Sequence, residues 1–436
     1  MPEIGGRNQP GPTPGVAYPA DTPVGAGIQA SVLPNGIKIL TESIASVRSV
    51  SLGVWVQQGS VHESEGEEGA SHLLEHMVFK GTGRRNPREI AMALERLGGS
   101  LDAFTSREHT SYQARVLSEH LPVALDVVSD LVLDPLLRPE DLELEREVVL
   151  EEIATVDDTP DDLVFELHGD LLWQGHPYGR SILGTRESVA EMEVETLRRL
   201  HGSRYLQGEL IVAAAGHLDH EEIHETVEAR FGHLPVGPGP TVPPLPPAGQ
   251  GRELHVPRET AQTHVVFGAQ TPPRSAPERI PLVLLSAAFG GGMSSRLFQK
   301  IREELALAYT VYAFQSFHTR AGASGVYVGT RPEWADRAVD AIRSEMRKIS
   351  GAGISERELR EVKDQVKGQV MLSLESTSAR LFRLAGFALH EQPYMTLDQL
   401  LARIEGVGLD EINAVAHRYL DPDVQSILRL GPEKGR

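Results

Sequence analysis

The sequence contains no cysteine among its 436 residues, and this absence narrows its chemistry. No disulfide can stabilise the fold and no thiolate can bind a metal, so a metal site would need histidine and carboxylate ligands. The chain also lacks an apolar run of about 18 residues, the length expected of a membrane-spanning helix. We therefore expect no membrane span.

Basic residues are scarce relative to acidic ones. Lys and Arg total 42 and Asp and Glu total 61, which gives a formal net charge of −19. Such a chain is repelled by a phosphate backbone, and we expect no nucleic-acid partner. Residues 1–27 contain one basic residue, Arg7, and no apolar core stretch, so they match neither a secretory signal nor a transit peptide. We expect a disordered leader there, whose role the sequence leaves open, and a cytoplasmic location.

The chain is too long for one ordinary core and fits two or three domains. The clearest candidate for a domain boundary is residues 234–251, which contain seven prolines and repeated glycines. Such a segment cannot form a helix or a central strand. We therefore predict a first domain over residues 28–233, a linker over 234–251, and a second domain over 252–436.

The two halves resemble each other in spacing. Pro177-Tyr178 precedes a helix-like segment ending at Tyr205, and Pro393-Tyr394 precedes a similar one ending at Tyr419. The paired tyrosines are 27 and 25 residues apart, which indicates duplication. Alternating and amphipathic stretches mix within each half. We predict two homologous α+β domains, each a mostly antiparallel sheet with helices packed on one face.

The clearest chemical pattern is His72-Leu73-Leu74-Glu75-His76. Positions i and i+4 share a helix face, so His72 and His76 can both direct imidazole nitrogens at one Zn²⁺. Glu75 lies beside His76, within reach of a metal-bound water. Two histidines and a carboxylate near an open coordination position suit metal-assisted hydrolysis. The alternative is an ordinary amphipathic helix with two hydrogen-bonded histidines.

A catalytic zinc site needs a third protein ligand. Residues 138–156 predict a helix that begins near Pro139 and is rich in Glu and Leu. Glu145 and Glu152 are seven residues apart and share one face of this helix. Spacing alone does not choose between Glu151 and Glu152 as the ligand. The alternative reading of these acids is a solvated helix face.

A second histidine pair, His220 and His224, forms an H-E-x-x-H pattern. Asp219 is a natural N-cap for a helix that buries Ile223 and later apolar residues. We therefore expect both histidines to face an acidic surface and not to bind a metal, although the sequence alone leaves metal binding open.

Three segments together resemble the pitrilysin-type, or inverzincin, zinc peptidases, and in particular the branch that includes the mitochondrial processing peptidase. They are residues 69–82, 145–152 and 302–309. The resemblance extends from about residue 28 to the C-terminus. It implies two α+β domains that enclose a cavity on dimerisation.

The resemblance also implies roles for single residues. His72, His76 and Glu152 match the zinc ligands, with one Zn²⁺ per chain. Glu75 matches the general base, and Glu145 matches an acid that orients a histidine ligand. Two further residues match a pair that the second domain offers to bound substrate: Arg302 and Tyr309.

Residues 101–112 resemble the edge strand of the family and the turn after it. An edge strand can bind an extended peptide by β-augmentation. The predicted peptide-binding residues are Asp102, Ala103, Phe104 and Thr105. Asp102 departs from the Asn that often occupies its position in the family, and this adds a negative charge near the expected cleft.

These observations predict a zinc-dependent endopeptidase that cleaves extended peptides or presequence-like segments with metal-activated water and Glu75 as base. One alternative is a non-catalytic scaffold or binding subunit of the same fold. Another is a dedicated maturation peptidase for one modified peptide. Because one chain carries both the zinc set and the Arg302–Tyr309 pair, we expect a homodimer, with a heterodimer as the alternative. The natural substrate and cleavage-site preference lie beyond the sequence.

Overall fold

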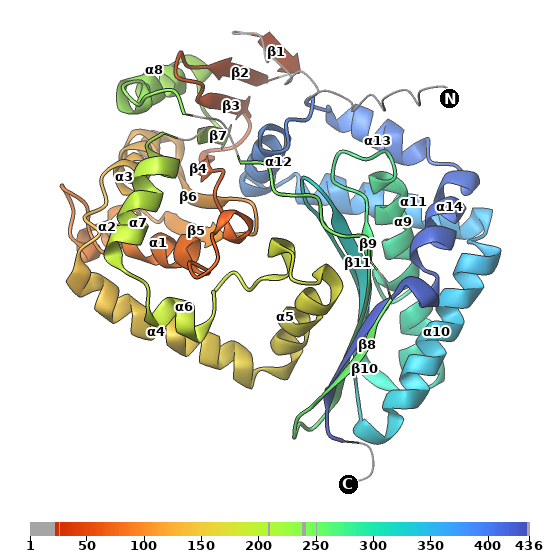
Figure 1. Ribbon diagram of the computed structural model, residues 1–436. Helices are drawn as coiled ribbons and strands as arrows, with labels where there is room; N and C mark the ends of the chain where they lie inside the picture. The colour runs from red at the N-terminus through yellow and green to blue at the C-terminus, as the bar shows by residue number, and fades with distance from the viewer. Residues whose placement is uncertain (1–21, 26, 208–209, 238–240, 250, 434–436) are drawn as a thin grey trace, which may run out of the picture.

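The computed structural model describes residues 22–25, 27–207, 210–237, 241–249 and 251–433, which form two sheets flanked by helices (Figure 1). The first sheet has the strand order β1-β2-β3-β7-β4-β6-β5. Its strands are β1 (Thr22–Gly25), β2 (Ile28–Val32), β3 (Lys38–Ser43), β4 (Ser49–Val56), β5 (Ser100–Thr105), β6 (Thr110–Leu117) and β7 (Leu210–Gly216). The second sheet has the order β10-β11-β9-β12-β8. Its strands are β8 (Glu253–Pro257), β9 (Thr263–Thr271), β10 (Ala308–Phe317), β11 (Gly322–Thr330) and β12 (Ser426–Gly431).

The two sheets repeat one topology. The order β3-β7-β4-β6-β5 in the first matches β8-β12-β9-β11-β10 in the second, strand for strand along the chain. In both sheets the neighbours are antiparallel except for one parallel pair, β3 with β7 and β8 with β12. The predicted α+β class is thereby confirmed, and the shared topology agrees with the duplication that the paired tyrosines indicate.

Helices cover one face of each sheet and enclose the main apolar cores. Those of the first half are α1 (Ala70–Val78), α2 (Pro87–Glu95), α3 (Leu121–Leu133), α4 (Pro139–Asp158), α5 (Pro160–Trp173), α6 (Arg186–Ala190), α7 (Val194–Leu200) and α8 (His220–Phe231). Those of the second half are α9 (Arg279–Gly290), α10 (Ala335–Ala352), α11 (Glu356–Ser373), α12 (Thr377–Leu389), α13 (Leu397–Glu405) and α14 (Leu409–Tyr419). Among the described residues, no helix is long and apolar enough to cross a membrane.

Each sheet also carries, on its opposite face, one helix from the other half of the chain, which the sequence did not predict. Helix α12 packs on β3, β4 and β7, where Leu384 belongs to an apolar cluster with Trp55 and Ile211. Helix α5 packs on β9 and β12, where Val164 lies in a cluster with Val266. These strands are covered on both faces, and β7 is accordingly a continuous apolar run. The exchange joins the two halves.

One strand lies inside the predicted leader. Within the predicted leader, residues 22–25 form β1, which pairs with β2, so the boundary placed at residue 27 is too late; residues 1–21 lie outside the described part. In the linker, the described residues 241–249 form neither helix nor strand, as their prolines require. The linker lies against the first domain, because His62 and His176 donate to the carbonyls of Thr241 and Pro244 respectively.

Candidate metal centre and peptide cleft

Helix α1 carries the H-x-x-E-H pattern, and its start is fixed by two residues. Gly69 precedes the helix at φ 91°, and a Cβ there would lie 2.5 Å from the carbonyl oxygen of Leu183. The buried carboxylate of Glu63 accepts the backbone N–H groups of Gly69 and Ser71 at 2.9 and 2.7 Å. These contacts satisfy otherwise unpaired donors of the first turn. The sequence analysis did not identify Glu63, which carries no motif.

His72, His76 and Glu152 converge, with one ligand atom from each lying within 4.8 Å of the others. The Nε2 atoms of His72 and His76 are 3.7 and 3.8 Å from the carboxylate oxygens of Glu152. Donors on a tetrahedral zinc with bonds of about 2.0–2.1 Å lie roughly 3.4 Å apart, so this spacing and donor set fit Zn²⁺. Glu151 is exposed, and Glu152 is the acid that faces the histidines.

Glu145 lies behind His76. Its carboxylate is 3.1 Å from His76 Nδ1 and 2.5 Å from Lys80 Nζ, and the side chain is 7% exposed. An acceptor at Nδ1 keeps the proton on that nitrogen and leaves Nε2 free to bind a metal. The structure therefore places Glu145 where the resemblance implies an orienting acid. Lys80 was not singled out from the sequence, although it follows directly after α1.

The environment of α1 shifts the pKa values of two motif residues. Burial and the neighbouring His76 lower the pKa of His72 to about 4, which favours the neutral imidazole that binds metals. Burial raises the pKa of Glu75, opposed by a 2.6 Å hydrogen bond that its carboxylate accepts from the Thr105 hydroxyl. A carboxylate with a raised pKa is a stronger base, as proton abstraction requires.

A cavity of about 540 Å³ opens beside His72 and Glu75. One wall is the predicted edge strand β5, which pairs only with β6 among the described strands and contributes Ala103, Phe104 and Thr105. Asp102 is exposed and does not line the cavity. The opposite wall was not predicted and consists of Val156, Asp162, Phe165, Glu166 and residues 181–183.

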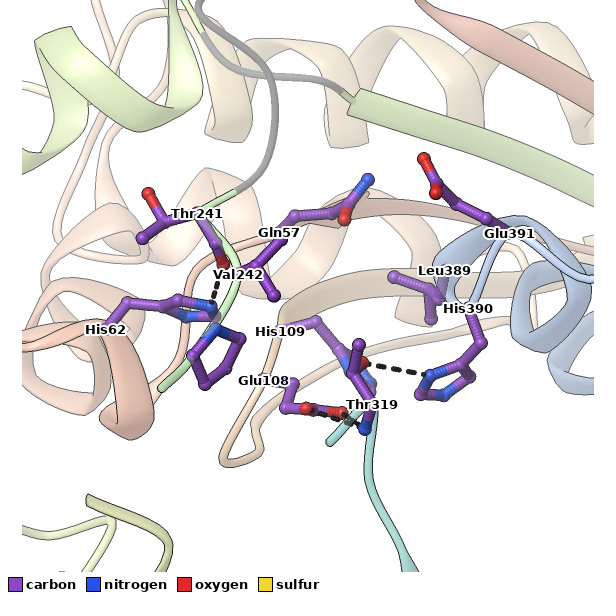
Figure 2. A pocket seen from close by; sticks show the side chains of 11 residues that line it. Gln57, His62, Glu108, His109, Thr241, Val242, Thr319, Leu389, His390 and Glu391 are labelled. Atoms are coloured by element: carbon purple, nitrogen blue, oxygen red, sulfur yellow. Dashed lines mark hydrogen bonds between the residues drawn. The ribbon is translucent and has the colours of Figure 1, made fainter. Parts of the chain in front are cut away.

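Helix α5 links this cleft to the second domain. The Phe165 ring lies 5.5 Å from the Tyr327 ring and 5.3 Å from the Phe314 ring, both on the second sheet. A further junction lies at the β5–β6 turn, where Glu108 accepts the Thr319 N–H at 2.9 Å (Figure 2). Glu108 also accepts the Tyr178 hydroxyl at 2.7 Å. The relative position of the two halves therefore sets the width of the cleft.

Arg302 and Tyr309 lie together in the second domain. The Arg302 guanidinium stacks 4.2 Å from the Tyr309 ring and donates a 3.1 Å hydrogen bond to the Tyr309 carbonyl. Tyr309 is 75% exposed. The pair lines a separate cavity that shares no lining residue with the metal-ligand cleft. Their predicted substrate contact stays a prediction.

The second histidine pair has a structural role. Asp219 caps α8, as expected. The prediction that His220 faces the surface is wrong, since this residue is 4% exposed and bonds Thr41 and Ser31 at 2.8 and 3.1 Å. His224 bonds Ser31 at 2.8 Å. The first turn of α8 packs over hydroxyls of β2 and β3, which satisfy the imidazoles. Among the described residues, the pair belongs to no metal-binding group.

Comparison with known proteins identifies the family of the chain. The family described as "Insulinase (Peptidase family M16)" matches residues 38–186, and "Peptidase M16 inactive domain" matches residues 191–366. The chain therefore belongs to peptidase family M16. This confirms the predicted resemblance at family level, while the processing-peptidase branch stays a prediction.

Similar proteins extend over nearly the whole chain. A protein of Mycobacterium leprae named an uncharacterized zinc protease is 39% identical over 93% of this chain and 92% of its own length. The zinc protease YmxG of Bacillus subtilis is 36% identical over 89% of this chain and 95% of its own. The crystal structure of a "peptidase M16 inactive domain" from Pseudomonas fluorescens has a TM-score of 0.88 at 20% identity, covering 94% of this chain and 99% of that one. A protease from Helicobacter pylori has a TM-score of 0.84 at 21% identity, covering 93% and 99%.

Proposed function

We propose that this chain is a zinc-dependent endopeptidase that cleaves extended peptides or presequence-like segments. The observation that carries the proposal is the convergence of His72, His76 and Glu152 beside Glu75, in a cleft walled by an edge strand. Relatives named zinc proteases support it. When held by these three side chains, Zn²⁺ supplies a Lewis acid that polarises a peptide carbonyl and acidifies a water.

The residues of the chain then have separate tasks. Glu75 takes a proton from the attacking water and passes it to the leaving nitrogen. The Thr105 hydroxyl holds the Glu75 carboxylate in place, and Glu145 keeps His76 in its ligand tautomer. The outer edge of β5 binds the substrate backbone through main-chain hydrogen bonds. An extended peptide can form these main-chain hydrogen bonds with β5, whereas we expect a folded protein not to enter the cleft.

We further propose one zinc per chain and a homodimer. The first follows because His72, His76 and Glu152 form the one metal-binding group among the described residues. The second follows because Arg302 and Tyr309 lie outside the cleft, and enclosure by a second copy is one way to bring such a pair to substrate. Zinc analysis of the purified chain and sedimentation velocity test these two statements directly. A zinc ratio well above one, or a monomer at all concentrations, would contradict them.

The central test compares the parent chain with Glu75→Gln on a peptide library read by mass spectrometry. We expect cleavage by the parent, inhibition by a zinc chelator, and loss of cleavage in the variant with zinc still bound. Glu147→Gln is the matched control, because Glu147 is an exposed acid on α4. Equal cleavage by Glu75→Gln would remove Glu75 from its role. A zinc-loaded parent that cleaves nothing would favour the dedicated maturation peptidase, and a parent that binds no zinc would favour the scaffold.

A further inference from the structure

A second cavity of about 990 Å³ lies in the second domain and has an unusual charge. Its lining residues come from the loop after β9, the start of α9, the end of α11, helix α12, helix α13 and the loop between the last two. Four arginines line it against one carboxylate, Glu391; they are Arg274, Arg279, Arg383 and Arg403. The chain as a whole carries a net charge of −19, so this lining locally reverses the sign of the protein's charge.

Two of these arginines have no carboxylate partner among the described residues, although the Arg279 guanidinium lies 5.9 Å from the centre of the Phe317 ring. Within the described part of the chain, neither Arg274 nor Arg279 forms a side-chain hydrogen bond or ion pair, and the Nε atom of each is buried. Burial and the charge of Arg279 lower the pKa of Arg274 to about 10. By contrast, Arg403 lies 3.6 Å from the Glu411 carboxylate. Partial burial of a cation without an ion-pair partner raises the free energy of the folded state, and an anionic ligand bound beside it would lower that free energy.

The neighbouring acid Glu108 compensates the charge of Arg274 only in part, because the two side chains form no ion pair. Glu108 is close enough to raise the pKa of Arg274, but its carboxylate already accepts hydrogen bonds from Tyr178 and Thr319. The guanidinium of Arg274 also lies close against α12, because a Cβ at Gly386 would come within 2.9 Å of its Nη2 atom. The cation is therefore held at the cavity wall by its packing.

Much of the remaining lining is apolar or aromatic, and its other polar side chains are Ser275, Ser373, His390, Gln392 and Gln399. Phe382, Phe387 and Tyr394 line the cavity, and the Arg383 guanidinium lies 5.4 and 4.9 Å from the Phe387 and Tyr394 rings. Cations and aromatic walls together suit a ligand in which a carboxylate is attached to an apolar group. The volume lies within the usual range for binding pockets, about 300–1,000 Å³.

One aromatic contact connects this cavity to the cleft. The ring of Phe382, which lines the cavity, lies 6.0 Å from the ring of Phe104, which lines the metal-ligand cleft on β5. A peptide bound along β5 would therefore pass close to Phe382 in the cavity lining. The ligand most readily delivered there is part of that same peptide.

We propose that this cavity binds a carboxylate-bearing segment of the peptide substrate, with Arg274 and Arg279 pairing the carboxylate and the aromatic rings holding an adjacent apolar side chain. The proposal rests on the proposed peptidase function. The carboxylate belongs either to the C-terminus of the peptide or to an acidic side chain, and the test separates these two sources.

The test measures binding by fluorescence anisotropy in the Glu75→Gln background, where bound peptide is not cleaved. Three labelled peptides share one Phe-containing sequence: an amidated neutral form, a form with a free C-terminal carboxylate, and an amidated form with one Glu beside the Phe. Charge-assisted pairing predicts binding of at least one carboxylate form about tenfold tighter than the neutral form. The tighter form identifies the source of the carboxylate.

The double variant Arg274→Gln/Arg279→Gln should abolish this preference. Arg357→Gln/Arg360→Gln removes the same charge from the exposed surface of α11 and should retain it. In case the first double variant does not fold, competition on the Glu75→Gln chain gives the same information, because phenylacetate should displace the peptide and neutral phenylacetamide should not. Equal binding of all three peptides, or equal displacement by both competitors, overturns the proposal.

The two proposals fail in different ways. A carboxylate preference in a chain that cleaves no library peptide leaves the carboxylate site in place and refutes only the general endopeptidase, with the dedicated maturation peptidase or the scaffold as the alternatives. Cleavage by the parent without any carboxylate preference refutes only the cavity assignment.

Discussion

Removing the charge of Glu145 should weaken zinc binding without unfolding the chain. Glu145 is not one of the three proposed zinc ligands. Its carboxylate lies 3.1 Å from Nδ1 of His76, on the side of the ring away from the proposed metal. Loss of an acceptor behind a histidine ligand typically lowers metal affinity by about 10–100-fold, or roughly 1.4–2.7 kcal/mol. In Glu145→Gln the amide oxygen can still accept the Nδ1 proton, so the expected loss is about tenfold. Glu145→Ala leaves that donor unpaired and should approach about a hundredfold.

The assay is competitive zinc titration of the apo chain against a fluorescent chelator at fixed pH and ionic strength. Glu147→Gln removes an equal charge from an exposed position of α4 and should change the affinity less than about twofold. Lys80, the other partner of Glu145, is partly exposed and can be solvated when the carboxylate is lost. If folded Glu145→Gln and Glu145→Ala both bind zinc as tightly as the parent, then Glu145 does not orient His76, and the reasoning fails.

Three further perturbations test the fold and the site. Leu384→Ala should lower the free energy of unfolding in urea by about 2–5 kcal/mol, because the Leu384 side chain is fully buried between α12 and the first sheet. The control is Leu372→Ala on α11, where the side chain is 76% exposed; it should change this free energy by less than about 0.5 kcal/mol. Burial and the nearby Arg274 lower the pKa of His109 to about 4. The free energy of unfolding that neutral His109 contributes is therefore present above its unfolded pKa of about 6.5 and is lost as the pH falls from 6.5 towards 4. The free energy of unfolding of His109→Gln, measured in urea, should depend less steeply on pH between 7 and 4 than that of the parent. Zinc at about 100 times its Kd should stabilise the parent by about 2.7 kcal/mol in thermal or urea unfolding, and equal stabilisation of His72→Ala would place zinc elsewhere.

The sequence predicted those parts of the fold that depend on local patterns. The helix expected over residues 138–156 is α4, and its buried side includes Leu142, Val149 and Ile153. The Pro-rich segment lies between the last strand of the first sheet and the first strand of the second, and the two sheets share a five-strand order. Periodicity does not reveal which sheet an apolar helix face will meet. The exchange of α5 and α12 was therefore outside the reach of the sequence argument.

In the candidate site, too, the residues set by local spacing were predicted and the contacts between distant segments were not. His72 and His76 follow from helical spacing, whereas the choice of Glu152 over Glu151 depended on the resemblance. Contacts between distant segments, such as Thr105 with Glu75, left no local signal. The error at His220 has the same origin. Its ring forms hydrogen bonds with the hydroxyls of Ser31 and Thr41, which lie far from it in the sequence.

The two exchanged helices explain why the walls that they contribute to the two cavities carry no sequence motif. Helix α5 lines the metal-ligand cleft with Asp162 and Glu166 and packs on the second sheet through Val164. Helix α12 lines the arginine cavity with Arg383 and packs on the first sheet through Leu384. In each helix one face joins the two halves and another forms a cavity wall. Each helix therefore serves both packing and the shape of a cavity, and we expect a substitution that loosens the junction to alter both cavities together.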